Sequence, residues 1–230
     1  TSNRVVALDL PGFGGSDKPP DAAYDFAFFE AAIDAFLDAV GIAGTGLAVH
    51  DLGGPVGLHW AARSGDRVTR LALLNTLVYP EFSDAVIAFI TACSSPQSRD
   101  WITGPEGLEA GMRLGLADAS RLTDESLAAV RAPFSTADDR AALAAAGIGL
   151  SPDGFGEIAA WLPTVRVPVR VVYGEQDRIL PDIADTVARV QRDVPQAQVT
   201  ALPDCGHFLQ EEAGPQIGEL LAEFFADGRT

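Results

Sequence analysis

Sulfur-containing residues are scarce, with two cysteines and one methionine among 230 residues. Cys93 and Cys205 are too few and too far apart in the sequence to indicate a disulfide framework or a metal site. The chain also lacks an apolar run long enough to span a bilayer, and its first residues show no signal-peptide pattern. These absences predict a cytoplasmic protein without a membrane segment.

Basic residues are the second shortage: 16 Lys and Arg stand against 32 Asp and Glu, giving a net charge of -16. Such a charge repels nucleic-acid phosphates and anionic membrane surfaces. We therefore expect no nucleic-acid or membrane partner, and the composition suits a small neutral organic substrate. With 47% hydrophobic residues, the length suits one well-buried domain with a subsidiary lid. The oligomeric state cannot be predicted.

Short apolar runs alternate with stretches of helical periodicity in the first third of the chain. Strands are expected at 4–9, 46–50 and 70–75, with helices at 28–40 and 56–63. This alternation is typical of a mostly parallel sheet with helices on both faces, the α/β class.

The pattern changes between Tyr79 and Trp161 to alanine-rich, helix-compatible stretches separated by Gly and Pro. Strands are expected again at 167–173 and 199–202, with a helix at 182–194 and another near the end of the chain. We expect core segments at 1–78 and 162–230, joined through a helical cap at 79–161.

One turn carries most of the chemical information. Asp51 follows a strand pattern and precedes Gly53 and Gly54, where a helix pattern begins; this is the outline of a nucleophile elbow with aspartate in place of serine. A carboxylate that attacks a carbonyl gives an anhydride, whereas attack on saturated carbon gives an ordinary ester. Asp51 therefore points to alkyl halides or epoxides. The alternative is that Asp51 only caps the following helix.

Two further polar residues follow predicted strands. Asp177 comes after the strand at 167–173, and His207 comes after the strand at 199–202. The chain order of nucleophile, acid and histidine is that of α/β-hydrolases, and strand ends are where α/β sheets place their chemistry. Glu175 or Asp182 could replace Asp177 as the acid, and His207 could be a structural histidine.

Several segments resemble those of haloalkane dehalogenases, which have the α/β-hydrolase fold. They are RVVALDLPGFGGSDKP, AVHDLGGPVGL, RLALLN, the stretch from Leu122 to Phe134, GEQDRILP and DCGHFLQE. In the most similar subgroup the acid lies at the position of Asp177, and Asn75 occupies the acid position of other subgroups.

The resemblance implies a reaction in two steps. Asp51 attacks the carbon that bears the halogen, and His207, supported by Asp177, activates the water that hydrolyses the resulting ester. Water is then the second reactant, and no cofactor or metal is required.

The chain departs from that family at two places. Leu52 stands where a tryptophan usually donates to the halide, so only the Leu52 backbone N–H is available, and Trp101 is the candidate for a second donor. Simple packing in the cap is the alternative role for Trp101. The strands that precede 4–9 in the family are apparently missing, so we expect a fragment or a sheet completed by another chain.

Two other functions stay open. An epoxide hydrolase shares the aspartate nucleophile but needs tyrosines in the cap, and the tyrosines here are Tyr24, Tyr79 and Tyr173. A catalytically silent binding protein with the same fold is the second alternative.

Overall fold

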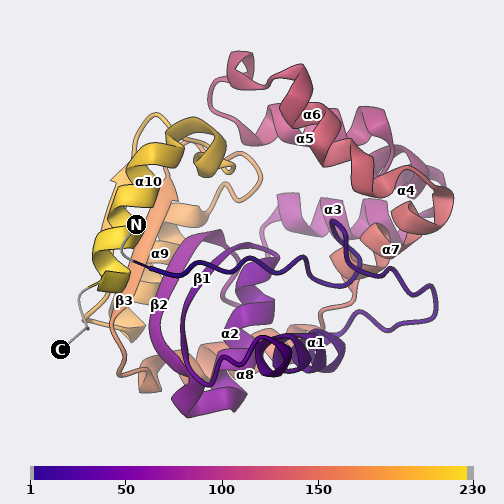
Figure 1. Cartoon of the computed structure of the whole chain (residues 1–230). Helices are drawn as coiled ribbons and strands as arrows, with labels where there is room; N and C mark the ends of the chain where they lie inside the picture. Colours follow the sequence, from indigo (N-terminus) through magenta and orange to yellow (C-terminus); the bar gives the residue numbers. More distant parts are fainter. Residues whose placement is uncertain (1–2, 227–230) are drawn as a thin grey trace.

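A computed structural model describes residues 3–226. Its centre is a parallel sheet in the order β1-β2-β3-β4 (Figure 1). The strands are β1 (Thr45–Asp51), β2 (Val68–Thr76), β3 (Val169–Gly174) and β4 (Gln198–Leu202). Because all of them run the same way, their carboxyl ends meet at one edge, where Asp51 pairs with Thr76 and Gly174 with Leu202.

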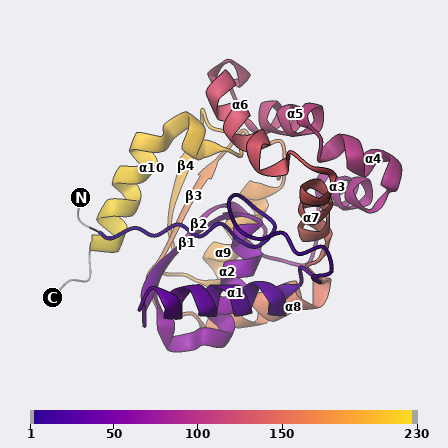
Figure 2. The ribbon, with the colours of Figure 1, turned by 45° about the vertical axis from the view of Figure 1, so that its right-hand side comes forward.

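Alternate residues of β2 supply two separate cores. Leu71 and Leu73 pack with residues of α2 (Gly53–Ser64), α8 (Pro152–Trp161) and α9 (Ile183–Asp193), whereas Ala72 and Leu74 pack with α10 (Leu209–Ala226). Figure 2 shows α10 on one side of the sheet and α2 on the other. The strands are apolar on both faces because helices cover both faces, which confirms the predicted α/β class.

Local capping explains where α1 (Phe26–Ala39) begins and ends. The Asp25 side chain accepts a hydrogen bond from the N–H of Phe28 at 2.9 Å, and Gly41 adopts a φ of 71° just beyond the helix. This helix packs against α2. The sequence prediction of 28–40 differs from the observed bounds by no more than two residues at either end.

The segment between β2 and β3 is helical in the structure. It contains α3 (Asp84–Ser94), α4 (Pro96–Ile102), α5 (Pro105–Gly115), α6 (Asp124–Arg131), α7 (Ala137–Ile148) and α8. Both views place α3 to α7 together on one side of the molecule (Figures 1 and 2). Within this group α7 also packs with residues of α1 and α2, and α8 packs against α2. The cap at 79–161 stays a prediction, and placing α8 with the core would end the cap at Ser151.

The expected strand at 4–9 is wrong. These residues form neither strand nor helix, and Val5 is 85% exposed. A strand needs a hydrogen-bonded neighbour, and β1, whose partner is β2, forms an edge of the sheet in the part of the chain that the structure describes. The apolar pattern of this segment therefore indicated burial that residues 3–226 do not provide.

Candidate active site

The turn after β1 has the backbone of a strained elbow. Asp51 has a φ of 46°, a left-handed conformation that is uncommon for residues other than glycine. A Cβ at Gly54 would lie 1.5 Å from the Thr76 hydroxyl oxygen, so only glycine allows this close approach. The same hydroxyl donates to the Asp51 carbonyl at 2.7 Å. Leu52 occupies the N-cap of α2 and no side chain caps it there, so helix capping does not explain Asp51.

Asp177 and His207 form a buried pair at the carboxyl ends of β3 and β4. The carboxylate oxygen Oδ2 of Asp177 lies 2.8 Å from Nδ1 of His207, and the two side chains are 0% and 1% exposed. The other carboxylate oxygen accepts the N–H groups of Ile179 and Leu180 at 2.8 and 2.7 Å. Glu175, an alternative acid, is exposed. The geometry therefore favours Asp177 as the residue that orients His207.

Asn75 supports this pair, a role that the sequence interpretation missed. Its side-chain N–H donates to Oδ2 of Asp177 at 2.7 Å, and its side-chain oxygen accepts the N–H of Gly174 at 2.9 Å. Asn75 is 1% exposed and has a φ of 25°. A polar residue at the end of a buried strand was the available signal. The sequence interpretation considered Asn75 only as a neutral residue at the acid position of other subgroups.

His207 also faces the carboxylate of Asp51. Its Nε2 lies 3.3 Å from Oδ1 of Asp51, whose side chain is 48% exposed. This is ion-pair distance, although Nε2 makes no well-aligned hydrogen bond within residues 3–226. The elbow thus presents an accessible carboxylate on one side and a buried imidazole on the other.

The charges of the site shift the pKa values of His207 and Asp51. Burial lowers the pKa of His207, but the carboxylates of Asp177 and Asp51 outweigh it and raise that pKa to about 9. Burial raises the pKa of Asp51, but His207, followed by His50 and the backbone N–H of Leu52, lowers it to about 2. These shifts favour an imidazolium at His207 and a carboxylate at Asp51 at neutral pH.

His50 stabilises the histidine loop. Its Nε2 lies 2.9 Å from the backbone oxygen of His207, and the centres of the two imidazole rings are 4.8 Å apart. A carbonyl accepts, so Nε2 of His50 must carry the proton that is donated. Burial and then the charge of His207 lower the pKa of His50, which keeps it a neutral donor.

The two expected leaving-group donors differ in their surroundings. The Leu52 side chain is partly buried with Tyr24 and Val56, and its backbone N–H is close enough to Asp51 to lower the pKa of that carboxyl. Trp101 lies in α4 and is 57% exposed. The Leu52 N–H therefore lies beside the carboxylate, whereas the Trp101 side chain is mostly open to solvent.

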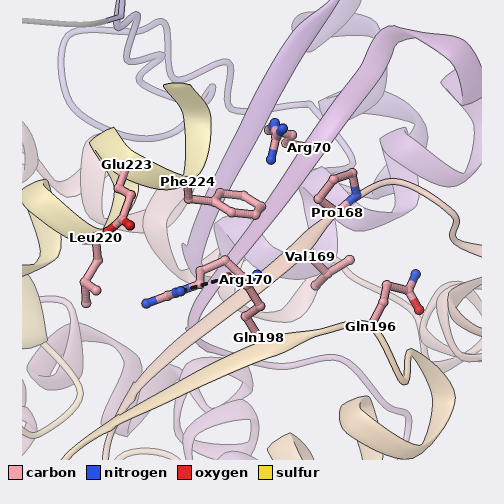
Figure 3. Close-up of a pocket in the computed structure, with 9 residues that line it drawn as sticks. All are labelled: Arg70, Pro168, Val169, Arg170, Gln196, Gln198, Leu220, Glu223 and Phe224. Carbon is pink, nitrogen blue, oxygen red and sulfur yellow. Dashed lines mark hydrogen bonds between the residues drawn. The ribbon is translucent and has the colours of Figure 1, made fainter. Parts of the chain in front are cut away.

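A polar cavity of about 160 Å³ lies elsewhere, at the amino ends of the strands (Figure 3). Arg70, Arg170 and Gln198 line it together with Phe224 of α10, and the Arg170 guanidinium donates to the Gln198 side chain at 3.0 Å. Since Asp51, Asp177 and His207 lie at the opposite edge of the sheet, this cavity is separate from the candidate active site.

Within residues 3–226, no group of three or more His, Cys, Asp or Glu side chains is arranged to hold a metal ion. No helix in the same range is long and apolar enough to cross a membrane.

The fold and the elbow define a class of protein. The sequence profile of the alpha/beta hydrolase family matches residues 1–217, so the chain belongs to that family. This confirms the predicted fold, but not the narrower resemblance to haloalkane dehalogenases.

Individual relatives carry different chemistries. A haloalkane dehalogenase of Mycolicibacterium smegmatis is 29% identical over 99% of this chain and 77% of its own. A cis-3-alkyl-4-alkyloxetan-2-one decarboxylase of Shewanella oneidensis is 26% identical over 100% of this chain and 76% of its own. The crystal structure of haloalkane dehalogenase DbeA from Bradyrhizobium elkani has a TM-score of 0.80 at 25% identity, covering 95% of this chain and 79% of that one.

Proposed function

We propose that this chain cleaves a carbon-halogen bond of a haloalkane, with Asp51 as the nucleophile. One observation carries the proposal: a half-exposed carboxylate on a strained elbow lies 3.3 Å from Nε2 of His207, whose other ring nitrogen is held by Asp177 at 2.8 Å. A nucleophile, a base and a group that orients the base are the parts that covalent hydrolysis requires.

The first step needs an ionised Asp51. Its pKa of about 2 keeps the carboxylate charged at neutral pH, so one oxygen can attack saturated carbon while the halide leaves with the bonding electron pair. The product is an alkyl ester of Asp51. His207 is not consumed in this step, and its positive charge helps to hold the carboxylate in place.

The second step needs a neutral His207. Ester formation removes the negative charge of Asp51, one of the two carboxylates that raise the pKa of His207, so this pKa falls and the imidazolium loses its proton to solvent. Neutral Nε2 then takes a proton from water, whose oxygen attacks the carboxyl carbon of Asp51 and releases the alcohol. Asp177 stabilises the imidazolium that forms again.

The halide needs hydrogen-bond donors as it leaves. The backbone N–H of Leu52 is the proposed donor beside Asp51, and Trp101 is the proposed second donor. Removing one donor from a developing charge typically costs about 100-fold to 1,000-fold in rate. If Trp101 donates, Trp101→Phe should slow bromide release by that order; a change within twofold would assign Trp101 to cap packing.

Trapping of the ester is the main test. His207→Phe incubated with a 1-bromoalkane should release about one equivalent of bromide and gain the mass of the alkyl group on the peptide that contains Asp51. The control is the double variant Asp51→Asn, His207→Phe, in which no adduct should form. An adduct on another residue would show that the nucleophile is assigned wrongly.

A second candidate substrate is a β-lactone, because the Shewanella oneidensis relative is named as an alkyloxetan-2-one decarboxylase. Asp51 would attack the saturated ring carbon that is bonded to the ring oxygen, and a carboxylate would leave. This leaving group does not need a halide-binding tryptophan at the position of Leu52. Loss of CO2 would then break the ester, form an alkene and return the carboxylate of Asp51. Alkene and CO2 from a cis-3,4-dialkyl oxetan-2-one, without bromide from bromoalkanes, would favour this substrate.

The remaining alternatives have less support. The Tyr24 hydroxyl donates to the Pro19 carbonyl at 3.1 Å and the Tyr79 hydroxyl to Asp193 at 2.7 Å, so neither is free to protonate an epoxide. Diol release from styrene oxide would reverse that preference. A silent binding protein has no need of the aligned Asp51, His207 and Asp177 set, and it would form no adduct with any of these substrates.

A further inference from the structure

Glu212 is an acidic side chain that the fold buries, with only 9% exposure. It lies in the first turn of α10, just before the bend at Ala213. One carboxylate oxygen, Oε2, accepts the backbone N–H of Gly206 at 2.6 Å, and the other, Oε1, accepts the backbone N–H of Asp118 at 3.0 Å. Both oxygens are therefore engaged, and each holds a different segment of the chain.

The two segments meet at the candidate active site. Gly206 directly precedes His207 in the loop after β4, whereas Asp118 follows α5 in the expected cap. The Glu212 carboxylate thus bridges the loop of the proposed base and the cap. Hydrogen bonds to a charged acceptor are stronger than those to a neutral acceptor, so a neutral side chain would not replace this bridge fully.

Further hydrogen bonds surround this bridge, along the contact between the turn after α5 and the loops that carry Asp177 and His207; we call this contact the seam. The N–H of His207 donates to the carbonyl of Gly115 at 2.6 Å, and the Arg178 guanidinium donates to the carbonyl of Leu116. The Arg121 guanidinium donates to the backbone carbonyl of Glu212. The turn after α5 is therefore connected to both catalytic loops, that of Asp177 through Arg178 and that of His207 directly.

The chain segments along this seam are tightly packed against one another. A Cβ on Gly206 would lie 2.3 Å from the carbonyl oxygen of Gly115, and a Cβ on Gly115 would lie 2.4 Å from the ring of Phe208. Because the backbones are this close, a shift of the turn after α5 must move the backbone of His207 as well.

We propose that Glu212 is a positioning residue for hydrolysis of the Asp51 ester: by holding Gly206 against Asp118, it aligns Nε2 of His207 with Asp51. This inference rests on the proposed function. Attack by Asp51 does not require a well-placed imidazole, whereas water activation does, so Glu212 should affect the second step selectively. Misplacing a catalytic group by about 1 Å can cost on the order of 100-fold in rate.

The matched pair Glu212→Gln and Glu211→Gln tests this. Both residues lie in the first turn of α10 and both changes remove one negative charge, but Glu211 is exposed. Glutamine keeps the shape of Glu212 yet offers one accepting oxygen instead of two, so one of the two backbone N–H groups loses its partner. In rapid-mixing experiments with a bromoalkane, Glu212→Gln should leave the bromide burst within about twofold and slow ester hydrolysis by about 10-fold to 100-fold.

Three outcomes would overturn the proposal: equal slowing of both steps, no slowing, or the same slowing in Glu211→Gln. If Glu212→Gln does not fold, Glu212→Asp takes its place, since it keeps the charge but shortens the reach. It too should slow hydrolysis more than the burst, and an unchanged ratio of the two rates would contradict the proposal.

A substrate-free measurement separates this proposal from the proposed function. The His207 imidazole should titrate near pH 9 by NMR in the wild type and in Glu211→Gln. In Glu212→Gln it should titrate nearer its ordinary pKa, because the contacts of His207 with Asp51 and Asp177 loosen. Absence of turnover in the wild type would defeat the proposed function alone. An unchanged His207 titration in Glu212→Gln, or fast exchange of the Gly206 amide in the wild type, would defeat the positioning role alone.

Discussion

The two halves of the candidate active site are built differently. The Asp177 and His207 side chains are 0% and 1% exposed, whereas the Asp51 side chain is 48% exposed. Asp177 accepts hydrogen bonds from two backbone N–H groups and from Asn75, so its carboxylate is fixed on every side. Folding alone therefore orients the buried pair before any substrate arrives.

Asp51 is fixed in its backbone and accessible in its side chain. The Thr76 hydroxyl donates to the Asp51 carbonyl, and the turn imposes the positive φ. The carboxylate itself lies 3.3 Å from Nε2 of His207 and near the Leu52 N–H. A nucleophile must reach a substrate, whereas an orienting acid must not move. The difference in burial thus matches a division of labour between attack and water activation.

The largest expected effect on turnover comes from replacing Asp51, the accessible part of the site. Asp51→Asn keeps the size of the side chain, and asparagine tolerates a positive φ, but an amide is not a competent nucleophile. Steady-state halide release should fall by about 10⁴-fold or more. The control Glu175→Gln, which neutralises an exposed carboxylate in the loop after β3, should change it by less than about twofold. Retained activity in Asp51→Asn would assign catalysis elsewhere.

Disrupting the buried pair of Asp177 and His207 should give the next largest effect on turnover. Asp177→Asn removes the charge that orients and stabilises the His207 imidazolium, and a comparable change in a serine protease costs about 10⁴-fold. Ester formation should continue, so mass spectrometry should detect an alkyl adduct on Asp51 that accumulates. If the ester does not accumulate while turnover is lost, then Asp177 acts in the first step and the division of labour is wrong.

The pH dependence of stability should sharpen the comparison. The folded-state pKa of His207, about 9, lies above its ordinary value of 6.5, so folding binds a proton in this range. The stabilisation is therefore complete below about pH 6.5 and is lost as the pH rises through about 9. Thermal melts from pH 6 to 10 should show a larger decrease for the wild type than for His207→Gln. Equal decreases would mean that the imidazolium is not held by the two carboxylates.

The smallest expected effect lies outside the site. The Tyr79 hydroxyl donates to Asp193 at 2.7 Å, and the Arg189 guanidinium lies 3.8 Å from the centre of its ring. Tyr79→Phe should lower the free energy of unfolding by about 1 kcal/mol, the usual value of one hydrogen bond. Turnover should stay within about twofold. A marked loss of activity on an epoxide would instead give Tyr79 a role in protonating that substrate.

Local sequence patterns predicted the core well where local and tertiary preferences agree. The runs around Leu71 and Val171 became β2 and β3 because helices cover both of their faces. The strand predicted for the equally apolar run at 4–9 is absent from the structure, because strand formation depends on a hydrogen-bonded neighbour that no local pattern reveals. The support from Asn75 and His50 was also missed, because each acts on a residue distant in the sequence.

By itself, the sequence determined the chemistry that is available: an aspartate in a glycine-rich turn after a strand, followed in order by an acid and a histidine after later strands. Only the tertiary structure decided which groups touch. The parallel sheet brings the ends of β1, β2, β3 and β4 to one edge, and packing of α5 and α10 beside that edge places Glu212 between Gly206 and Asp118. Such contacts join distant segments, so their distances depend on how whole elements pack rather than on any local pattern of residues.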